Sequence, residues 1–261
     1  MKKQMLDVIF TSEKRKNILL VLRDRPENMD TLLRLLDTKR TALLPQIRIL
    51  EEHHLVTGSD GLYKLTTIGR LLVNQIFPLQ TTINVFDSDI DYWGTHFIDF
   101  IPSHLMKRID ELGPCEVIKP HVTELYDINR EFYDATRKSQ SHYVITTFLH
   151  PNFAELAVEL INNGVALNFI ISQDLLHNLL KNHNAVLSDF IQNELVSVFV
   201  YPKKMDFQFI SVNEYQTMLA LFKNNGDADT KYLLCKGEDT FRWGKEIFEY
   251  YLKDSTAITE I

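Results

Sequence analysis

Short apolar segments alternate with amphipathic ones from residue 114 to residue 253, and this alternation constrains the fold more than any other feature. The apolar segments are rich in β-branched and aromatic residues and lie at residues 115–118, 142–148, 165–171, 195–201, 207–212, 215–222 and 231–235. The amphipathic segments have helical periodicity and lie at residues 121–139, 151–164, 172–183, 185–193 and 238–253. Such alternation predicts an α/β sheet, and the late strands without intervening helices predict an antiparallel portion.

Two details of this half refine the expectation. Leu125, Ile128, Phe132 and Ala135 fall on one face of a single helix predicted for residues 121–139. Ser172 is the expected N-cap of the helix that follows the buried strand at residues 165–171.

The first 75 residues follow a different order. Three helices are expected, the first capped by Ser12, the second beginning at about Asp30 and the third ending near residue 54. Two short strands then flank a turn at Asp60 and Gly61, a dipeptide typical of hairpins. Thr66 is expected to cap a fourth helix. The predicted order is helix, helix, helix, hairpin, helix.

Pro45 lies inside the third of these helices, where a proline costs about 3 kcal/mol if it interrupts regular hydrogen bonding. A helix that begins near Thr41 places Pro45 close to its first turn, where backbone N–H groups have no intrahelical acceptor. We therefore expect a continuous helix whose basic N-terminal end is available for contacts.

This half resembles winged helix-turn-helix transcription regulators. The resemblance rests on the Leu-Glu-Glu pattern within residues 47–56, the Asp60-Gly61 hairpin tip and the Leu-Thr-x-x-Gly motif at residues 65–69. It implies that the N-terminal turns of the third helix enter the major groove of double-stranded DNA. Arg and Gln side chains can then read bases, while Lys, Thr and Ser contact phosphates. The candidate DNA-contacting residues are Lys39, Arg40, Thr41, Gln46, Arg48, Ser59 and Lys64.

Apolar residues at heptad spacing form a seam after the hairpin. They are Leu72, Ile76, Leu79, Ile83, Phe86, Ile90, Trp93 and Phe97. Pro78 is expected to divide this run into two helices. The seam fits either a homodimer interface that sets the spacing of two DNA-binding modules or a helix packed within one chain, and the pattern does not decide between them.

The second half resembles the effector domain of archaeal regulators of the methanogenesis-regulatory, FilR-like type, which are similar in layout to TrmB-like sugar sensors. The matching stretches are residues 91–113, 215–229 and 243–255. The resemblance implies a fold similar to one half of a phospholipase-D-like domain. Phospholipase-D chemistry needs a histidine with a lysine two residues later, and none of the nine histidines has one.

We therefore expect no enzyme and no cofactor, since glycine-rich nucleotide motifs and nucleophile elbows are also absent from the sequence. A small-molecule effector is expected instead. Trp93, His96 and His104 are candidate effector-binding residues because they lie where the seam meets the second half. Burial of Trp93 and His96 for packing is the alternative. A metal site from His96, His104 and Asp99 is a further hypothesis.

The net charge of −7 argues against a nucleic-acid binder, but its distribution argues for one, because residues 1–75 carry more Lys and Arg than Asp and Glu. Chance variation between two domains is the alternative explanation of this asymmetry. The expected compartment is the cytoplasm. No apolar run reaches the roughly 20 residues needed to cross a membrane. Cys115 and Cys235 are too few and too isolated to predict a disulfide framework.

The sequence thus predicts an α+β protein with three regions. These are a winged helix-turn-helix domain at residues 1–76, a helical connector at residues 77–113 and an α/β effector domain at residues 114–261. The alternatives are a winged-helix module that binds only protein and an enzyme in the α/β half.

Overall fold

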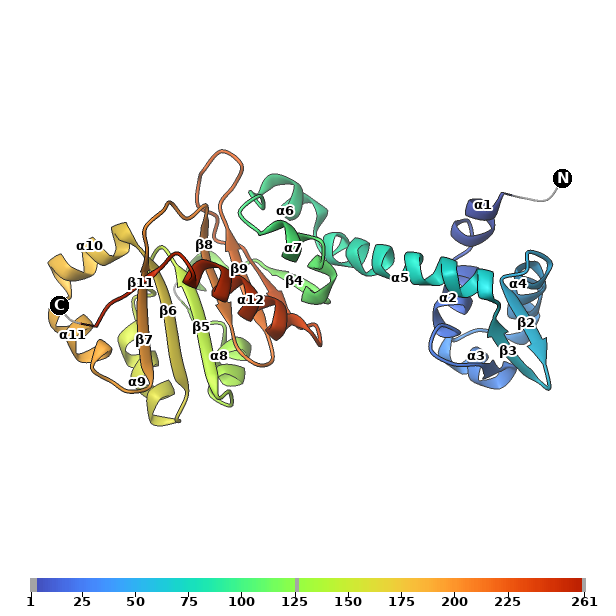
Figure 1. The fold of residues 1–261 in the computed structure, drawn as a ribbon, viewed down its shortest axis with the longest axis horizontal. Helices are drawn as coiled ribbons and strands as arrows, with labels where there is room; N and C mark the ends of the chain where they lie inside the picture. Colours follow the sequence, from blue (N-terminus) through green and yellow to red (C-terminus); the bar gives the residue numbers. More distant parts are fainter. Residues whose placement is uncertain (1–3, 125–126, 260–261) are drawn as a thin grey trace. The chain divides into compact units, whose positions relative to one another are not determined.

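The structure, a computed structural model, describes residues 4–124 and 127–259 (Figure 1). The chain divides into two compact units, residues 1–81 and residues 82–261. The boundary lies within one long helix, α5 (Thr67–Asp87). Within the described residues, no helix is both long and apolar enough to span a membrane.

The first unit consists of helices and one small sheet. In order along the chain its elements before α5 are α1 (Met5–Phe10), α2 (Glu13–Val21), β1 (Glu27–Asn28), α3 (Met29–Leu35), α4 (Arg40–Glu52), β2 (Val56–Ser59) and β3 (Leu62–Leu65). The predicted succession of three helices, a hairpin and a helix is confirmed, while α1 and β1 were not predicted. The core is formed by fully buried residues of α2, α3, α4 and the segment after α4, among them Ile18, Leu32, Leu43, Ile47 and Leu55.

The local chemistry that the sequence predicts at the helix ends and at the turn is present. The Ser12 hydroxyl caps α2 by accepting a hydrogen bond from the Arg15 backbone N–H. At the tip of the hairpin, Asp60 and Gly61 have φ values of 54° and 77°. Positive φ at both central residues is what the type I′ turn of a two-residue hairpin requires. The sheet has the order β1-β3-β2.

Pro78 does not divide the seam, and this expectation was wrong. Helix α5 runs without interruption through Pro78 to Asp87, and the proline ring lies on an exposed side of the helix. The chain instead breaks at Asp89, whose carboxylate accepts from the Tyr92 backbone N–H and starts α6 (Ile90–Thr95). Pro78 removes one backbone hydrogen bond from α5 but does not end the helix. The second helix begins only where the Asp89 side chain caps its first turn.

The second unit is built on one eight-stranded sheet. After the short helices α7 (Ser103–Met106) and η1 (Ile109–Leu112), its strands are β4 (Cys115–Ile118), β5 (Ser141–Thr146), β6 (Ala166–Ser172), β7 (Val196–Tyr201), β8 (Phe207–Val212), β9 (Thr217–Leu221), β10 (Tyr232–Cys235) and β11 (Thr256–Ala257). The strand order is β11-β7-β6-β5-β8-β9-β10-β4. Strands β5, β6 and β7 are parallel, and the remaining pairs are antiparallel. The predicted mixed sheet with a late antiparallel portion is confirmed.

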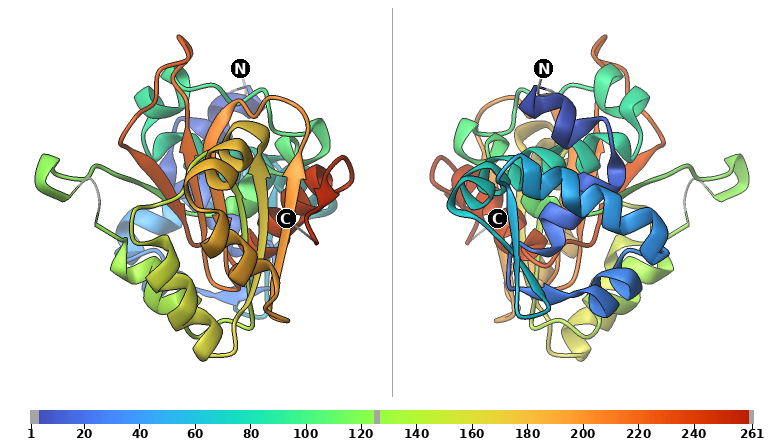
Figure 2. Two further views of the ribbon diagram at one scale, coloured as in Figure 1. Left: turned by 90° about the vertical axis from the view of Figure 1, so that its left-hand side faces the viewer. Right: turned by 90° about the vertical axis from the view of Figure 1, so that its right-hand side faces the viewer.

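Helices cover both faces of this sheet. They are η2 (Val122–Glu124), α8 (Arg130–Thr136), α9 (Phe153–Asn162), α10 (Gln173–Asn182), α11 (Asn184–Ile191) and α12 (Thr240–Leu252). Figure 2 shows α12 (red) and α9 (yellow-green) on opposite sides of the strands. Trp243 and Ile247 of α12 are fully buried in the larger core, and Ala157 and Leu160 of α9 pack into the core on the other face.

The prediction of a single helix at residues 121–139 was also wrong. The segment contains the short η2 and then α8, which begins at Arg130 because the Asn129 side chain accepts from the Phe132 backbone N–H. Phe132 is buried and Ile128 and Ala135 are half-buried. Leu125 lies outside the described residues.

The two cysteines form a disulfide that could not be predicted from their separation in the sequence. Cys115 of β4 lies directly opposite Cys235 of β10 in the antiparallel register, and the two are joined by a disulfide across 120 residues. Because the two cysteines are too few and too isolated in the sequence to predict a disulfide framework, this bond was not predicted. Sheet register, which brings distant segments together, is not visible in cysteine spacing.

Candidate functional site

Helix α4 has one buried and one exposed side. Leu43, Ile47 and Leu50 have no exposed surface, whereas Thr41, Pro45 and Arg48 are exposed. Spacings of four and three residues place these three exposed residues on one face of the helix. Lys39, the N-cap residue, and Arg40 are also exposed. The structure therefore presents a basic, solvent-accessible end of a helix whose other face is fixed in the core.

Pro45 lies deeper in α4 than the sequence suggested. The helix begins at Arg40, so Pro45 is the sixth helical residue and not part of the first turn. Its missing N–H would have bonded the backbone carbonyl of Thr41. That carbonyl therefore lacks its usual intrahelical donor and lies at the exposed, N-terminal end of the helix.

Gln46 differs from the other predicted contact residues because its side chain is already engaged. It is half-buried, and its Oε1 accepts hydrogen bonds from Arg15 Nη1 at 2.8 Å and from the Ser12 hydroxyl at 3.4 Å. Arg15 is itself buried and also donates to the Val8 carbonyl and to Thr11 Oγ1. Gln46 therefore joins α4 to α2 through its side-chain carbonyl oxygen, and only the two N–H groups of its amide nitrogen are left to donate.

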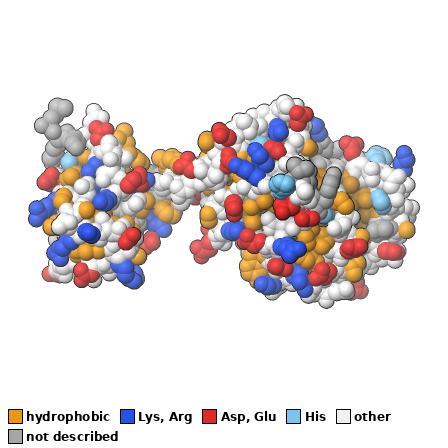
Figure 3. Space-filling model, turned by 180° about the vertical axis from the view of Figure 1, so that it is seen from behind, with side chains coloured by type: hydrophobic (Ala, Val, Ile, Leu, Met, Phe, Trp, Pro, Cys, Tyr) orange, Lys and Arg blue, Asp and Glu red, His pale blue; other side chains and the backbone are white. Residues whose placement is uncertain are grey.

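The hairpin residues proposed to contact DNA are exposed. Ser59 ends β2, and Lys64 lies in β3 opposite Thr57. Between them the hairpin turns at Asp60 and Gly61, and β2 packs against α4. Basic side chains are spread over the visible face of this smaller unit (Figure 3).

Two of the three candidate effector-binding residues lie in the protein interior. Trp93 is 3% exposed, its Nε1 donates to the Val85 carbonyl at 3.0 Å, and its ring meets the edge of Phe86 at 5.3 Å. This is the packing role given above as the alternative. His104 is exposed, and its ring centroid is 6.3 Å from that of Tyr250. The structure does not bring Trp93, His96 and His104 together into one described pocket.

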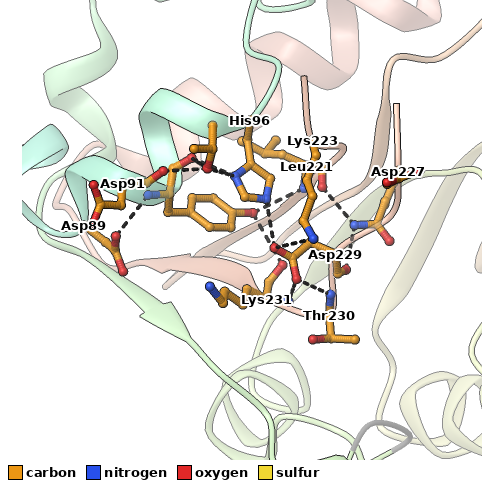
Figure 4. Close-up of polar contacts among 12 residues, drawn as sticks. Asp89, Asp91, His96, Leu221, Lys223, Asp227, Asp229, Thr230 and Lys231 are labelled. Atoms are coloured by element: carbon orange, nitrogen blue, oxygen red, sulfur yellow. Dashed lines mark hydrogen bonds and ion pairs between the residues drawn. The ribbon is translucent and has the colours of Figure 1, made fainter. Parts of the chain in front are cut away.

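His96 is buried in a polar cluster that joins α6 to the loop before β10 (Figure 4). Its Nδ1 lies 2.7 Å from the Tyr92 carbonyl, its Nε2 lies 3.1 Å from Asp229 Oδ2, and its ring stacks on Tyr92 at 3.9 Å. Burial raises the pKa of Asp229, but the Lys231 backbone N–H and the Lys223 charge outweigh it, so the pKa is lowered overall. Every polar atom of the His96 ring has a protein partner, which indicates a structural role.

Metal binding receives no support from the described part of the chain. No group of three or more His, Cys, Asp or Glu side chains there is arranged to hold an ion. His96 is paired with Asp229 and does not form such a group with His104 and Asp99, so the hypothesis of a metal site there is not supported.

The second unit contains a cavity of about 410 Å³ that was not predicted from the sequence. It lies between the sheet and helices α8 and α9, and residues from 120 to 232 line it. Its polar lining includes His142 and His150, which lie on β5 and just after it. An alternation of inward and outward residues along β5 could have placed His142 on this face, but the cavity itself depends on how α8 and α9 pack.

Comparisons with known proteins agree on a family. Residues 3–86 match the N-terminal domain, and residues 125–254 the middle domain, of methanogenesis regulatory protein FilR1. The curated FilR1 of Methanothrix harundinacea (strain 6Ac) is 22% identical over 97% of this chain, and the chain spans 58% of the length of that relative.

Two solved structures are more distant. The archaeal chromatin protein TrmBL2 is 12% identical over 97% of both chains, with a TM-score of 0.43. Nuc, a phospholipase D family member from Salmonella typhimurium, is 9% identical over 56% of this chain and 99% of its own, with a TM-score of 0.41. At these scores neither likeness establishes a shared fold, so the phospholipase-D-like half stays a prediction. The two domain matches describe one family and together cover most of the sequence, and the chain therefore belongs to the FilR1 family of methanogenesis regulatory proteins.

Proposed function

We propose that this protein is a transcription regulator that binds double-stranded DNA through α4 and the hairpin β2–β3 of a winged helix-turn-helix domain. The observation that carries the proposal is the exposed basic end of α4, with Lys39, Arg40, Thr41 and Arg48 accessible while the opposite face of the helix is buried. A helix held in this way can enter the major groove without rearrangement of its own domain. The family name supports a regulatory role.

The contacts divide by chemistry. Arg40 and Arg48 can pair bidentately with guanine, and each good base contact is worth roughly 1–3 kcal/mol of discrimination. Lys39, Thr41, Ser59 and Lys64 are assigned to phosphates, which supply affinity without sequence information. Because Gln46 accepts from Arg15, its paired reading of adenine would require that contact to break, so it contributes less than the sequence suggested.

The proposal includes a homodimer in the cytoplasm. Helix α5 exposes large apolar side chains that the described part of its own chain does not cover, namely Ile68, Leu71, Leu79 and Ile83. A second α5 could cover them and set the distance between two DNA-binding domains. The second unit would then act by binding a signal and not by catalysis, favouring one dimer geometry over another.

Titration of random duplex DNA with the full chain at several salt concentrations tests the proposal. We expect affinity to fall steeply with salt, because phosphate contacts release counterions. On a duplex recovered by binding-site selection, the double variant Arg40→Ala/Arg48→Ala is expected to weaken binding by at least tenfold, because two base contacts are lost. A matched variant, Lys138→Ala/Lys181→Ala, removes two exposed positive charges from the second unit and should bind as the parent does.

Salt-independent binding would contradict binding through phosphate contacts. Equal effects of the two double variants would show that α4 does not contact the DNA. Unchanged nucleic-acid binding with Arg40 and Arg48 removed would favour a protein-docking role for this domain. Binding-site selection from random duplexes then gives the half-site spacing, which for a dimer should be near one helical turn of DNA or a multiple of it.

A further inference from the structure

The cavity in the second unit has the walls of a ligand site. Alternate residues of β5 (His142, Val144 and Thr146) face it, as do residues of β6, β8 and β9, and helices α8 and α9 close the other side. The cavity is open to solvent on one side, where its lining residues Asp127 and Phe148 are exposed. Its volume of about 410 Å³ lies within the size range of small-molecule sites.

The lining is mostly apolar, and many of its side chains are aromatic. The aromatic side chains come from both helices, from three strands and from the segment after β5, and include Phe132, Phe148, Phe153, Phe169, Phe209 and Tyr232. Apolar walls with a few polar groups are typical of small-molecule pockets. A 150 Å³ apolar cavity accommodates benzene, so by proportion this one accommodates roughly 15 non-hydrogen atoms.

Two histidines supply polar groups that have no partner within the described residues. His142 Nδ1 and His150 Nε2 are both covered from solvent and unbonded. The other nitrogen of His142, Nε2, lies 2.7 Å from the Ser211 hydroxyl. Since that hydroxyl can donate or accept, Nδ1 can take the complementary role toward a ligand. Buried polar atoms without partners are rare and call for an explanation, which a bound molecule provides.

The role of His150 is more restricted. Its Nδ1 accepts a hydrogen bond from the Asn152 backbone N–H at 3.2 Å. The proton of the ring therefore resides on Nε2, which is left as a donor. A ligand that satisfies both histidines carries at least one acceptor, such as a hydroxyl or carbonyl oxygen.

Charge excludes most other ligand classes. No Lys or Arg is among the described residues that line the cavity. Burial of an anion there would leave its charge unpaired, which is unfavourable. Of the two acidic lining residues, Asp127 is exposed, and Asp229 is occupied by His96, Lys223 and the backbone N–H groups of Thr230 and Lys231. A buried cation would therefore also lack a free carboxylate.

We propose that this cavity binds an uncharged, mostly apolar small molecule with at least one hydroxyl or carbonyl group that hydrogen-bonds His142, His150 or both. This inference rests on the proposed sensing role of the second unit and gives it a ligand class. The effector site then lies on the α8–α9 face of the sheet and not at Trp93, His96 or His104.

Calorimetric titration of the full chain with three matched probes tests the proposal. The probes are 2-naphthol, which is neutral, 2-naphthoate, which is anionic, and 2-naphthylmethylamine, which is cationic when protonated. We expect 2-naphthol to bind at one site, and the two charged probes to bind at least tenfold more weakly. Equal or tighter binding of a charged probe overturns the ligand class, and absence of binding by all three overturns the site.

Variants locate the probe. Ala220 of β9 is buried and lines the cavity, so Ala220→Leu fills space that the probe needs and should weaken 2-naphthol binding at least tenfold. Ala257→Leu, an exposed position on β11, is the matched control and should have no effect. His142→Phe should weaken binding about three- to tenfold through the lost hydrogen bond, whereas His104→Phe should not.

A second readout covers the case in which Ala220→Leu fails to fold. In the parent protein, 2-naphthol should shift the ¹⁵N resonances of the His142 and His150 rings and leave that of His104 unchanged. Probe binding that leaves both cavity histidines unchanged would place the probe elsewhere and overturn the proposal. DNA titration is a separate measurement. If the protein binds 2-naphthol in the cavity but does not bind DNA, only the regulator proposal is rejected. If it binds DNA but not 2-naphthol, only the proposal of a ligand site in the cavity is rejected.

Discussion

Arg15 Nη1 of α2 lies 2.8 Å from Gln46 Oε1 of α4, and this hydrogen bond crosses 31 residues of sequence. The same guanidinium donates to the Val8 carbonyl and to Thr11 Oγ1 at the end of α1. One buried side chain therefore holds together α1, α2 and the helix proposed to contact DNA. An unpaired acceptor left behind in such a position is destabilising by about 1–3 kcal/mol.

Replacement of this residue tests its role. Arg15→Met keeps most of the apolar volume but removes every donor, so we expect the first unit to lose about 2–4 kcal/mol, since several acceptors are left unpaired. The measurement is amide hydrogen exchange of α4 in the full chain. Lys14→Met changes the exposed neighbour and should have little effect; similar protection in both variants would show that the Arg15 contacts contribute nothing.

Gly69 permits a close approach of two backbone segments. A Cβ at this position would lie 2.0 Å from the Leu55 carbonyl oxygen, and no flexible side chain can move aside there. We expect Gly69→Ala to destabilise the first unit by roughly 1–3 kcal/mol or more, since overpacking forces the backbone to shift. Thermal unfolding and exchange of α5 amides measure the change.

Gly94 provides the comparison for that substitution. It is also helical, but a Cβ there would meet nothing within 4 Å. Gly94→Ala should be neutral or stabilise the second unit by up to about 1 kcal/mol, because alanine is the better helix former. Equal changes in stability for Gly69→Ala and Gly94→Ala would show that the close approach to the Leu55 carbonyl is not the reason a glycine is needed at position 69.

His142 should make stability depend on pH. Burial lowers its pKa to about 4, whereas an unfolded histidine titrates near 6.5. Between these values the unfolded state binds more protons than the folded state, so the free energy of unfolding falls as pH is lowered from about 6.5 toward 4. The slope from one such group reaches about 1.4 kcal/mol per pH unit.

Denaturant unfolding at pH 7, 6 and 5 measures that slope. His142→Phe should reduce it, whereas His104→Phe, at an exposed position, should retain it. A slope unchanged in His142→Phe would mean that the pKa of His142 is the same in the folded and unfolded states, which would contradict its burial as a neutral ring.

The disulfide between Cys115 and Cys235 should stabilise the second unit. Closing a loop across 120 residues restricts the unfolded chain, an effect worth typically 2–4 kcal/mol. We expect the denatured, unreduced protein to show no free thiols, and reductant to lower its denaturation midpoint. Cys115→Ala/Cys235→Ala should unfold at the lower midpoint with or without reductant. Two titratable thiols in the unreduced protein would contradict the pairing.

Local chemistry was predictable from the sequence because it acts over a few residues. The Ser12 cap, the Asp60-Gly61 turn and the buried stripe of α4 each depend on side chains within one or two helical turns or a single hairpin. The alternation in the second half likewise predicted the strands and most of the helices, since burial on one face imposes a fixed period. The exposure of Arg40 and Arg48 follows from the same periodicity.

Contacts between distant segments were decided by the tertiary structure. Helix α5 continues through Pro78, whose ring lies on an exposed side of the helix, although a proline at an interior position favours a break. His96 meets Asp229 across 133 residues, Cys115 meets Cys235 through sheet register, and the cavity around His142 exists because two helices stand off the sheet there. The sequence by itself determined most of the helical and extended segments and the faces they bury; the packing of strands and helices, a cooperative property of the whole chain, decided which of them meet.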